Sequence, residues 1–87
     1  MCEIPIGLVI QSPSNGQSFS VQSVTIQGQI SDLGATLTMN GTPIVPNING
    51  SFSLNETLPN ASNSFVFEAT NGDTSCDEQY TLVLNVG

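Results

Sequence analysis

Residues 35–44 read ATLTMNGTPI, and this stretch decides the fold class. Its first half alternates apolar residues with threonines, which is the period-two pattern of a β-strand with one buried face. The dipeptide Asn40-Gly41 follows at once and is the strongest short-range signal for a two-residue hairpin, because both positions tolerate positive φ. The stretch therefore predicts a strand over 35–39, a tight turn, and a short return strand over 42–46.

The same alternation recurs on both sides of this hairpin. No window has helical spacing over the ten or more residues that a helix would need. We expect strands over residues 4–10, 19–30, 35–39, 42–46, 51–58, 64–70 and 78–86, with turn-forming residues between them. About seven short strands with turns every eight to twelve residues are typical of a β-sandwich. The sequence thus predicts an all-β chain whose residues 1–87 form a single domain of about seven antiparallel strands.

Strand parity also predicts the core. The side chains expected to face inward are Val24, Ile26, Ile30, Leu37, Met39, Phe52, Leu54, Leu58, Phe65, Phe67, Ala69, Tyr80, Leu82, Leu84 and Val86. The alternate positions carry mostly threonine, serine, glutamine and asparagine, so the outer faces are polar and almost uncharged. Because the aromatic residues are expected inside, the outer faces offer no platform for stacking a sugar.

The order of these signals resembles bacterial immunoglobulin-like modules, particularly the glucodextranase-B-like group. The matching residues are Ile10, Ser12, Pro13, Asn15 and Gly16, then Gly28, Ile30 and Asp32, then Gly34, Ala35, Leu37, Asn40 and Gly41, and finally Gly50, Phe52, Asn63, Phe65, Phe67 and Ala69. The chain differs from antibody domains in lacking tryptophan and their cysteine pair. The resemblance implies an immunoglobulin-like β-sandwich that serves as a spacer, adhesive or scaffold module without catalysis.

Immunoglobulin strand order would gather several turns at one end of the molecule. The N-terminus and the turns at 31–34, 47–50 and 71–77 would meet at one pole, and the C-terminus would leave from the other. Termini at opposite ends suit modules linked in tandem.

The two cysteines have three interpretations. In that topology the first and last strands pair in parallel, with Ile6 beside Tyr80, which would bring Cys2 beside Cys76. A disulfide there would indicate an oxidising compartment. Alternatively, Cys2 is the lipidated first residue of a mature lipoprotein, which would be the one route to a membrane, or the two cysteines are free or bridge different subunits. Zinc is disfavoured, since two cysteines without histidine cannot complete a tetrahedral site.

The charge of the chain excludes several functions. It contains seven Asp and Glu residues but no lysine, arginine or histidine, so its net charge is −7. Binding to nucleic acids or to anionic membranes depends on cationic side chains, and we exclude both. Histidine, lysine and arginine also supply most general bases and oxyanion clamps, so we expect no enzyme.

The predicted topology places most of the carboxylates together. Asp32, Asp73, Asp77 and Glu78, with Glu3 nearby, would share the N-terminal pole without a cation. Ca²⁺ binds carboxylate and amide oxygens, so these four residues are candidate Ca²⁺ ligands, although their spacing matches no EF-hand. Solvated acidic loops without a metal are the alternative.

These observations predict an extracellular, non-catalytic structural or adhesive module of a cell-surface protein. The unguarded, uncharged strand edges also favour assembly with neighbouring copies into a filament, since edges are normally protected by lysine. An accessory module that binds Ca²⁺ or carbohydrate in a secreted protein is the alternative. In either case we expect neighbouring copies or tandem domains as partners, and no cofactor other than Ca²⁺.

Overall fold

The computed structural model describes residues 2–3 and 5–87 and shows a sandwich of two β-sheets. The strands are β1 (Val9–Ser12), β2 (Ser18–Phe19), β3 (Ser23–Gln29), β4 (Thr36–Met39), β5 (Thr42–Ile44), β6 (Ser51–Thr57), β7 (Ser62–Thr70) and β8 (Glu78–Val86), and a 3₁₀ turn, η1 (Thr74–Cys76), precedes β8. One sheet has the order β1-β3-β6 and the other β2-β8-β7-β4-β5. The all-β sandwich predicted from the sequence is confirmed.

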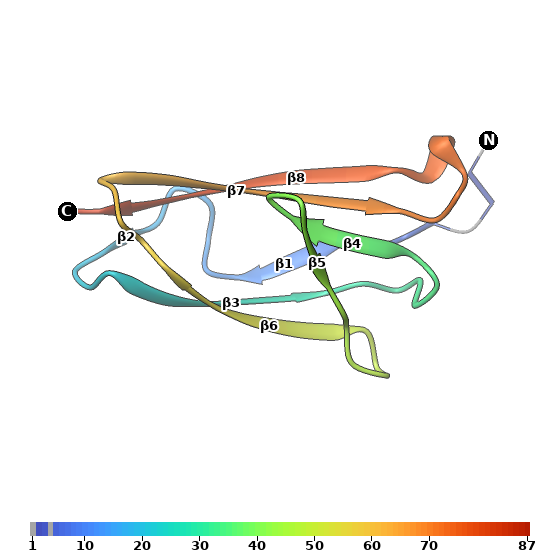
Figure 1. The fold of residues 1–87 in the computed structure, drawn as a ribbon, viewed down its shortest axis with the longest axis horizontal. Coiled ribbons are helices and arrows are strands. Elements are labelled where there is room, and N and C mark those ends of the chain that lie inside the picture. The colour runs from blue at the N-terminus through green and yellow to red at the C-terminus, as the bar shows by residue number, and fades with distance from the viewer. Residues whose placement is uncertain (1, 4) are drawn as a thin grey trace.

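All neighbouring strands are antiparallel except one pair. Strand β2 runs parallel to the end of β8, with Ser18 opposite Asn85 and Phe19 opposite Val86. The molecule is elongated, with extents of 42 × 23 × 19 Å, and its two ends lie at opposite poles (Figure 1). Figure 1 also shows the turns after β3, β5 and β7 near the N-terminal pole, as the sequence predicts.

The core fills the space between the sheets. Its largest fully buried side chains are Phe67, Ile6, Ile26, Ile30, Leu37, Leu58, Leu82 and Leu84. Buried and exposed residues alternate over all seven positions of strand β3, as the period-two pattern of its sequence predicts. Phe52 and Phe67 meet across the core with ring centroids 6.3 Å apart, so the predicted inward aromatic residues do join the two sheets.

The hairpin that predicts the fold has the expected turn. Asn40 has φ 51° and Gly41 has φ 84°, as a two-residue hairpin with positive φ at both positions requires. The side-chain oxygen of Asn40 also accepts a hydrogen bond from the Val66 amide at 2.9 Å, which ties the turn to β7.

Three sequence predictions need correction. The predicted strand over 19–30 is two strands, because β2 pairs with one sheet and β3 belongs to the other. The first strand begins at Val9, not at residue 4, which itself lies outside the described residues. Tyr80, predicted in the core, is 37% exposed, because β2 covers β8 only at its far end and leaves the edge beside Tyr80 open.

Candidate functional site

The N-terminal pole holds the strongest chemical feature of the chain, a disulfide between Cys2 and Cys76. Their Cα atoms are 4.9 Å apart and they are separated by 74 positions in the sequence. Cys76 is buried and Cys2 packs against the core cluster. Both cysteines are therefore used within the chain, as the first of the three interpretations predicts.

The geometry that brings the cysteines together differs from the prediction. The carbonyl of Ile6 does not face Tyr80; it accepts hydrogen bonds from the amides of Ser31 and Asp32, at 2.9 and 3.1 Å. The N-terminal segment thus lies along the end of β3. Parallel pairing with β8 occurs at the opposite pole, through β2. The cysteine pair was predicted correctly from a strand register that is wrong.

Asp73 shapes the turn that carries Cys76. It caps η1, and its Oδ1 accepts from the Ser75 hydroxyl at 2.6 Å and from the Ser75 amide at 3.0 Å. These two hydrogen bonds, the hydroxyl first, hold the pKa of Asp73 below its usual value because they stabilise the charged form. The Cys76 amide in turn donates to the Asp73 carbonyl at 2.9 Å, which fixes the position of the cysteine.

Asn71 connects this turn to the turn after β3. Its amide nitrogen donates to Asp32 Oδ2 at 3.2 Å, and its oxygen accepts from the Asp73 amide at 3.0 Å. The other oxygen of Asp32 accepts from the Gly34 amide at 2.9 Å. The hydrogen bond from Asn71 to Asp32 therefore joins the turn after β3, which connects the two sheets, to the loop between β7 and β8, which lies within the five-stranded sheet.

Glu78 also holds the N-terminal segment, through a hydrogen bond to the backbone. Its Oε2 accepts from the Gly7 amide at 2.9 Å. Gly7 has φ 69°, and a Cβ at this position would come within 2.6 Å of the Ser31 hydroxyl oxygen. Only glycine fits the chain here without a shift, so a glycine and a carboxylate together support the disulfide.

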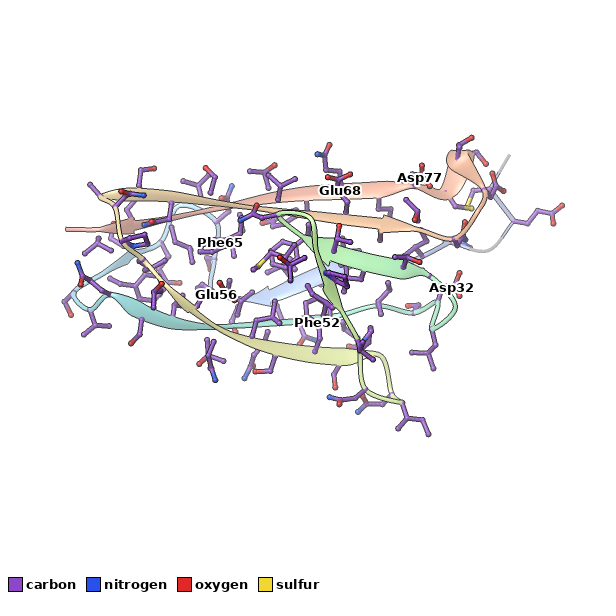
Figure 2. The ribbon with its side chains drawn as sticks, viewed as in Figure 1. Asp32, Phe52, Glu56, Phe65, Glu68 and Asp77 are labelled. Carbon is purple, nitrogen blue, oxygen red and sulfur yellow. A yellow bond between two sulfur atoms is a disulfide. The ribbon has the colours of Figure 1, made fainter. Side chains whose placement is uncertain are left out.

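The four predicted Ca²⁺ ligands share the pole but do not converge. Asp32, Asp73 and Glu78 each accept hydrogen bonds from separate donors, and Asp77 is exposed. Figure 2 shows Asp32 and Asp77 near this end of the molecule, on different loops. Among residues 2–3 and 5–87, no three Asp, Glu, Cys or His residues are grouped so that they could hold a metal ion. Calcium binding stays a prediction, without an arranged site to support it.

At the opposite pole, hydrogen bonds join two segments, residues 15–19 and 83–87, and we call this contact the terminal clasp. Backbone hydrogen bonds join Gly16 to Val83, Asn85 to Gln17 and Gly87 to Phe19, at 2.6, 2.9 and 3.2 Å. The Asn15 side chain also accepts from the Val83 amide at 2.8 Å. The last residues of β8 are thus bound to the segment that precedes β3.

Several of these residues were not predicted as functional. The side-chain oxygens of Asn71 and Asn15 accept from backbone amides, whereas the Ser75 hydroxyl donates to the Asp73 carboxylate. The sequence signal of these residues is the turn chemistry of asparagine, aspartate and serine. The Asp73-Thr-Ser75 spacing is a capping pattern that sequence inspection can identify. The contact of Glu78 with Gly7 crosses 71 positions and has no local signal.

The described surface is mainly polar, with one apolar projection. Val45 and Ile48, in the connection between β5 and β6, are 90% and 92% exposed. Figure 1 shows this connection standing out from the body near the N-terminal pole. No helix among the described residues is both long and apolar enough to cross a membrane.

Comparison of the chain with protein-family models, with curated proteins and with solved structures gave no match. The function of the chain is therefore inferred from its own geometry and chemistry.

Proposed function

We propose that this chain is a non-catalytic, extracellular structural or adhesive module of a cell-surface protein or surface filament. The observation that carries the proposal is the elongated body, 42 Å long, whose ends leave from opposite poles and whose N-terminal segment is covalently fixed to the turn before the last strand. Such a body can be joined to copies of itself in a line without steric conflict. The disulfide supports an extracellular location, since disulfides persist mainly in oxidising compartments.

The surface gives little support to catalysis. One shallow hollow is lined by Ser23, Val24, Thr25, Asn55, Glu56 and Thr57, and a second lies between the turn at Asn40 and the start of β7. The first contains a single carboxylate and the second none. Carboxylate catalysis of glycoside hydrolysis needs two such groups facing each other.

Binding of carbohydrate is less well supported than a structural role. Phe52, Phe65 and Phe67 are buried, as predicted. Among residues 2–3 and 5–87, Tyr80 is the one aromatic side chain that is exposed, and it lies at an edge of a sheet rather than on an open face. A single edge ring does not make the aromatic platform that sugar-binding surfaces usually have.

Labelling of intact cells tests the location. Antibodies raised against the purified chain should stain unpermeabilised cells that express the parent protein. Staining that requires permeabilisation would contradict an extracellular module.

Sedimentation of the isolated chain distinguishes a module that associates with its own copies from one that only spaces neighbouring domains. If copies associate laterally, the exposed apolar loop between β5 and β6 is the expected contact, and the double change Val45→Ser and Ile48→Ser should lower the association constant at least about tenfold. Val21→Ser is the matched control, because Val21 is 55% exposed elsewhere on the surface and should leave association unchanged. If the chain is strictly monomeric up to millimolar concentration, lateral assembly is contradicted and the spacer role is retained.

A further inference from the structure

The disulfide divides the chain into a short path and a long closed loop. It joins Cys2 to Cys76, which are 74 positions apart. Beyond Cys76, the chain runs through Asp77 and β8 to Gly87. A pull on the two ends of the chain therefore follows a covalent route through the disulfide and β8, and residues 3–75 carry none of it.

This route is already almost straight. Strand β8 contains nine residues and runs along the length of the molecule from the N-terminal to the C-terminal pole (Figure 1). At about 3.3 Å per residue, the chain from Cys76 to Gly87 spans about 36 Å, which is most of the 42 Å length of the body. Full extension at about 3.5 Å per residue adds only a few Å. The covalent route is nearly as long as the folded protein and has almost no slack.

We propose that the protein is a link of fixed length, in which tension passes through the Cys2–Cys76 disulfide and β8 while the rest of the fold carries no load. Force promotes unfolding only as far as unfolding lengthens the path between the points of attachment. Because that path cannot lengthen here, pulling gives the unfolded state no advantage over the folded one. The use of such a link in a surface chain rests on the proposed function, whereas the mechanical property rests only on the connectivity of the disulfide.

Without the disulfide, tension takes a different route. The N-terminal side would first load the hydrogen bonds of Ile6 and the pairing of β1 with β3, and then residues 15–19. The C-terminal side would pull on residues 83–87, which form the other half of the terminal clasp. Since β2 and β8 are parallel and their ends would be pulled toward opposite poles, the hydrogen bonds of the clasp would be loaded together in shear. Once the clasp breaks, the whole chain is free to extend. The reduced protein is therefore expected to resist and then unfold in one step.

Single-molecule stretching tests the proposal. The full chain, fused at both ends to peptide tags for attachment, is pulled between handles under oxidising conditions. We expect a gain of about 10 Å or less before the handles detach. Reductant added while the molecule is held under tension should then produce a step of about 260 Å, which is 87 residues at about 3.5 Å each less the 42 Å folded length.

The variant Cys2→Ser with Cys76→Ser should show the same step of about 260 Å without reductant. The reductant experiment uses the wild-type protein, so it tests the proposal even if the double variant does not fold during expression. Steps of this size in the wild-type protein, with its disulfide verified by thiol titration, would overturn the proposal, and so would the absence of a step after verified reduction. Cell staining that places the chain inside the cell would instead remove the proposed function and leave the mechanical result intact.

Discussion

At the scale of single residues, two glycines with similar backbone angles have different surroundings. Gly41 has φ 84° and an added Cβ would meet nothing within 4 Å, whereas Gly50 has φ 86° and a Cβ there would collide with the Ile30 carbonyl oxygen. Gly41→Ala should cost about 1–2 kcal/mol of unfolding free energy, from the left-handed backbone alone. Gly50→Ala should cost at least about 2 kcal/mol more, because the collision also disturbs the hydrogen bond from the Ile30 amide to the Gly50 carbonyl. Urea denaturation of both variants measures the difference, and equal costs would contradict the packing at Gly50.

The lowered pKa of Asp73 provides a second test at this scale. Ser75→Ala removes the hydroxyl that contributes most to the lowering, so the pKa of Asp73 should rise toward its ordinary value while staying somewhat below it, since the Ser75 amide still donates. In the wild-type protein this carboxylate favours the folded state above the unfolded pKa of about 3.9, and its contribution is lost as the pH falls through the lower folded value. Titration of the Asp73 side-chain carbon by NMR measures the shift. Thr74→Ala is the control, and the same pKa in wild type and Ser75→Ala would contradict the capping contact.

At the scale of elements, the alternation of inward and outward side chains explains why the sequence predicts β8 correctly and the strand over 19–30 wrongly. Strand β8 was predicted with its observed bounds, because alternation runs unbroken to Val86. The predicted strand over 19–30 contained a conflict: Phe19 is odd-numbered and Val24 even-numbered, so one continuous strand cannot turn both inward. The structure resolves the conflict by a bend between β2 and β3, where the chain passes from one sheet to the other. Which sheet each piece joins depends on contacts distant in sequence and has no local signal.

The loop before β7 depends on one buried polar side chain. Asn63 is 7% exposed; its nitrogen donates to the carbonyls of Asn60 and Leu84, and its oxygen accepts from the Asn60 amide. Asn63→Ala should lower the unfolding free energy by about 1–3 kcal/mol, because those backbone groups lose partners where water has little access. Ser64→Ala, one position along on the exposed face, should change it by less than about 0.5 kcal/mol. Thermal and urea unfolding of the two variants provide the comparison. If Asn63→Ala loses no more unfolding free energy than Ser64→Ala, the hydrogen bonds of Asn63 do not hold the loop.

At the scale of the whole molecule, the gathering of loops at one pole was predictable and the chemistry of that pole was not. Alternating strands place the turns after β3, β5 and β7 together, and this brought Asp32, Asp73 and Cys76 to one end as expected. The four carboxylates are candidate ligands of a shared Ca²⁺ ion, or solvated acidic side chains, from their position alone. The donors that they accept from, such as the Gly7 amide against Glu78, come from backbone geometry that the sequence pattern does not supply.

Net charge provides the last test, because −7 without any basic side chain makes the folded state repel itself. Salt screens that repulsion: the Debye length falls from about 10 Å at 0.1 M to about 3 Å at 1 M. Raising NaCl from 0.01 to 0.5 M should therefore increase the melting temperature by several degrees, and CaCl₂ at equal ionic strength should raise it by a similar amount, since the carboxylates at the pole accept separate hydrogen bonds. A further rise specific to millimolar Ca²⁺, abolished by Asp32→Asn but not by Glu68→Gln on the outer face of β7, would instead establish the calcium site. Chloride is the common anion in both titrations, so the comparison isolates the cation.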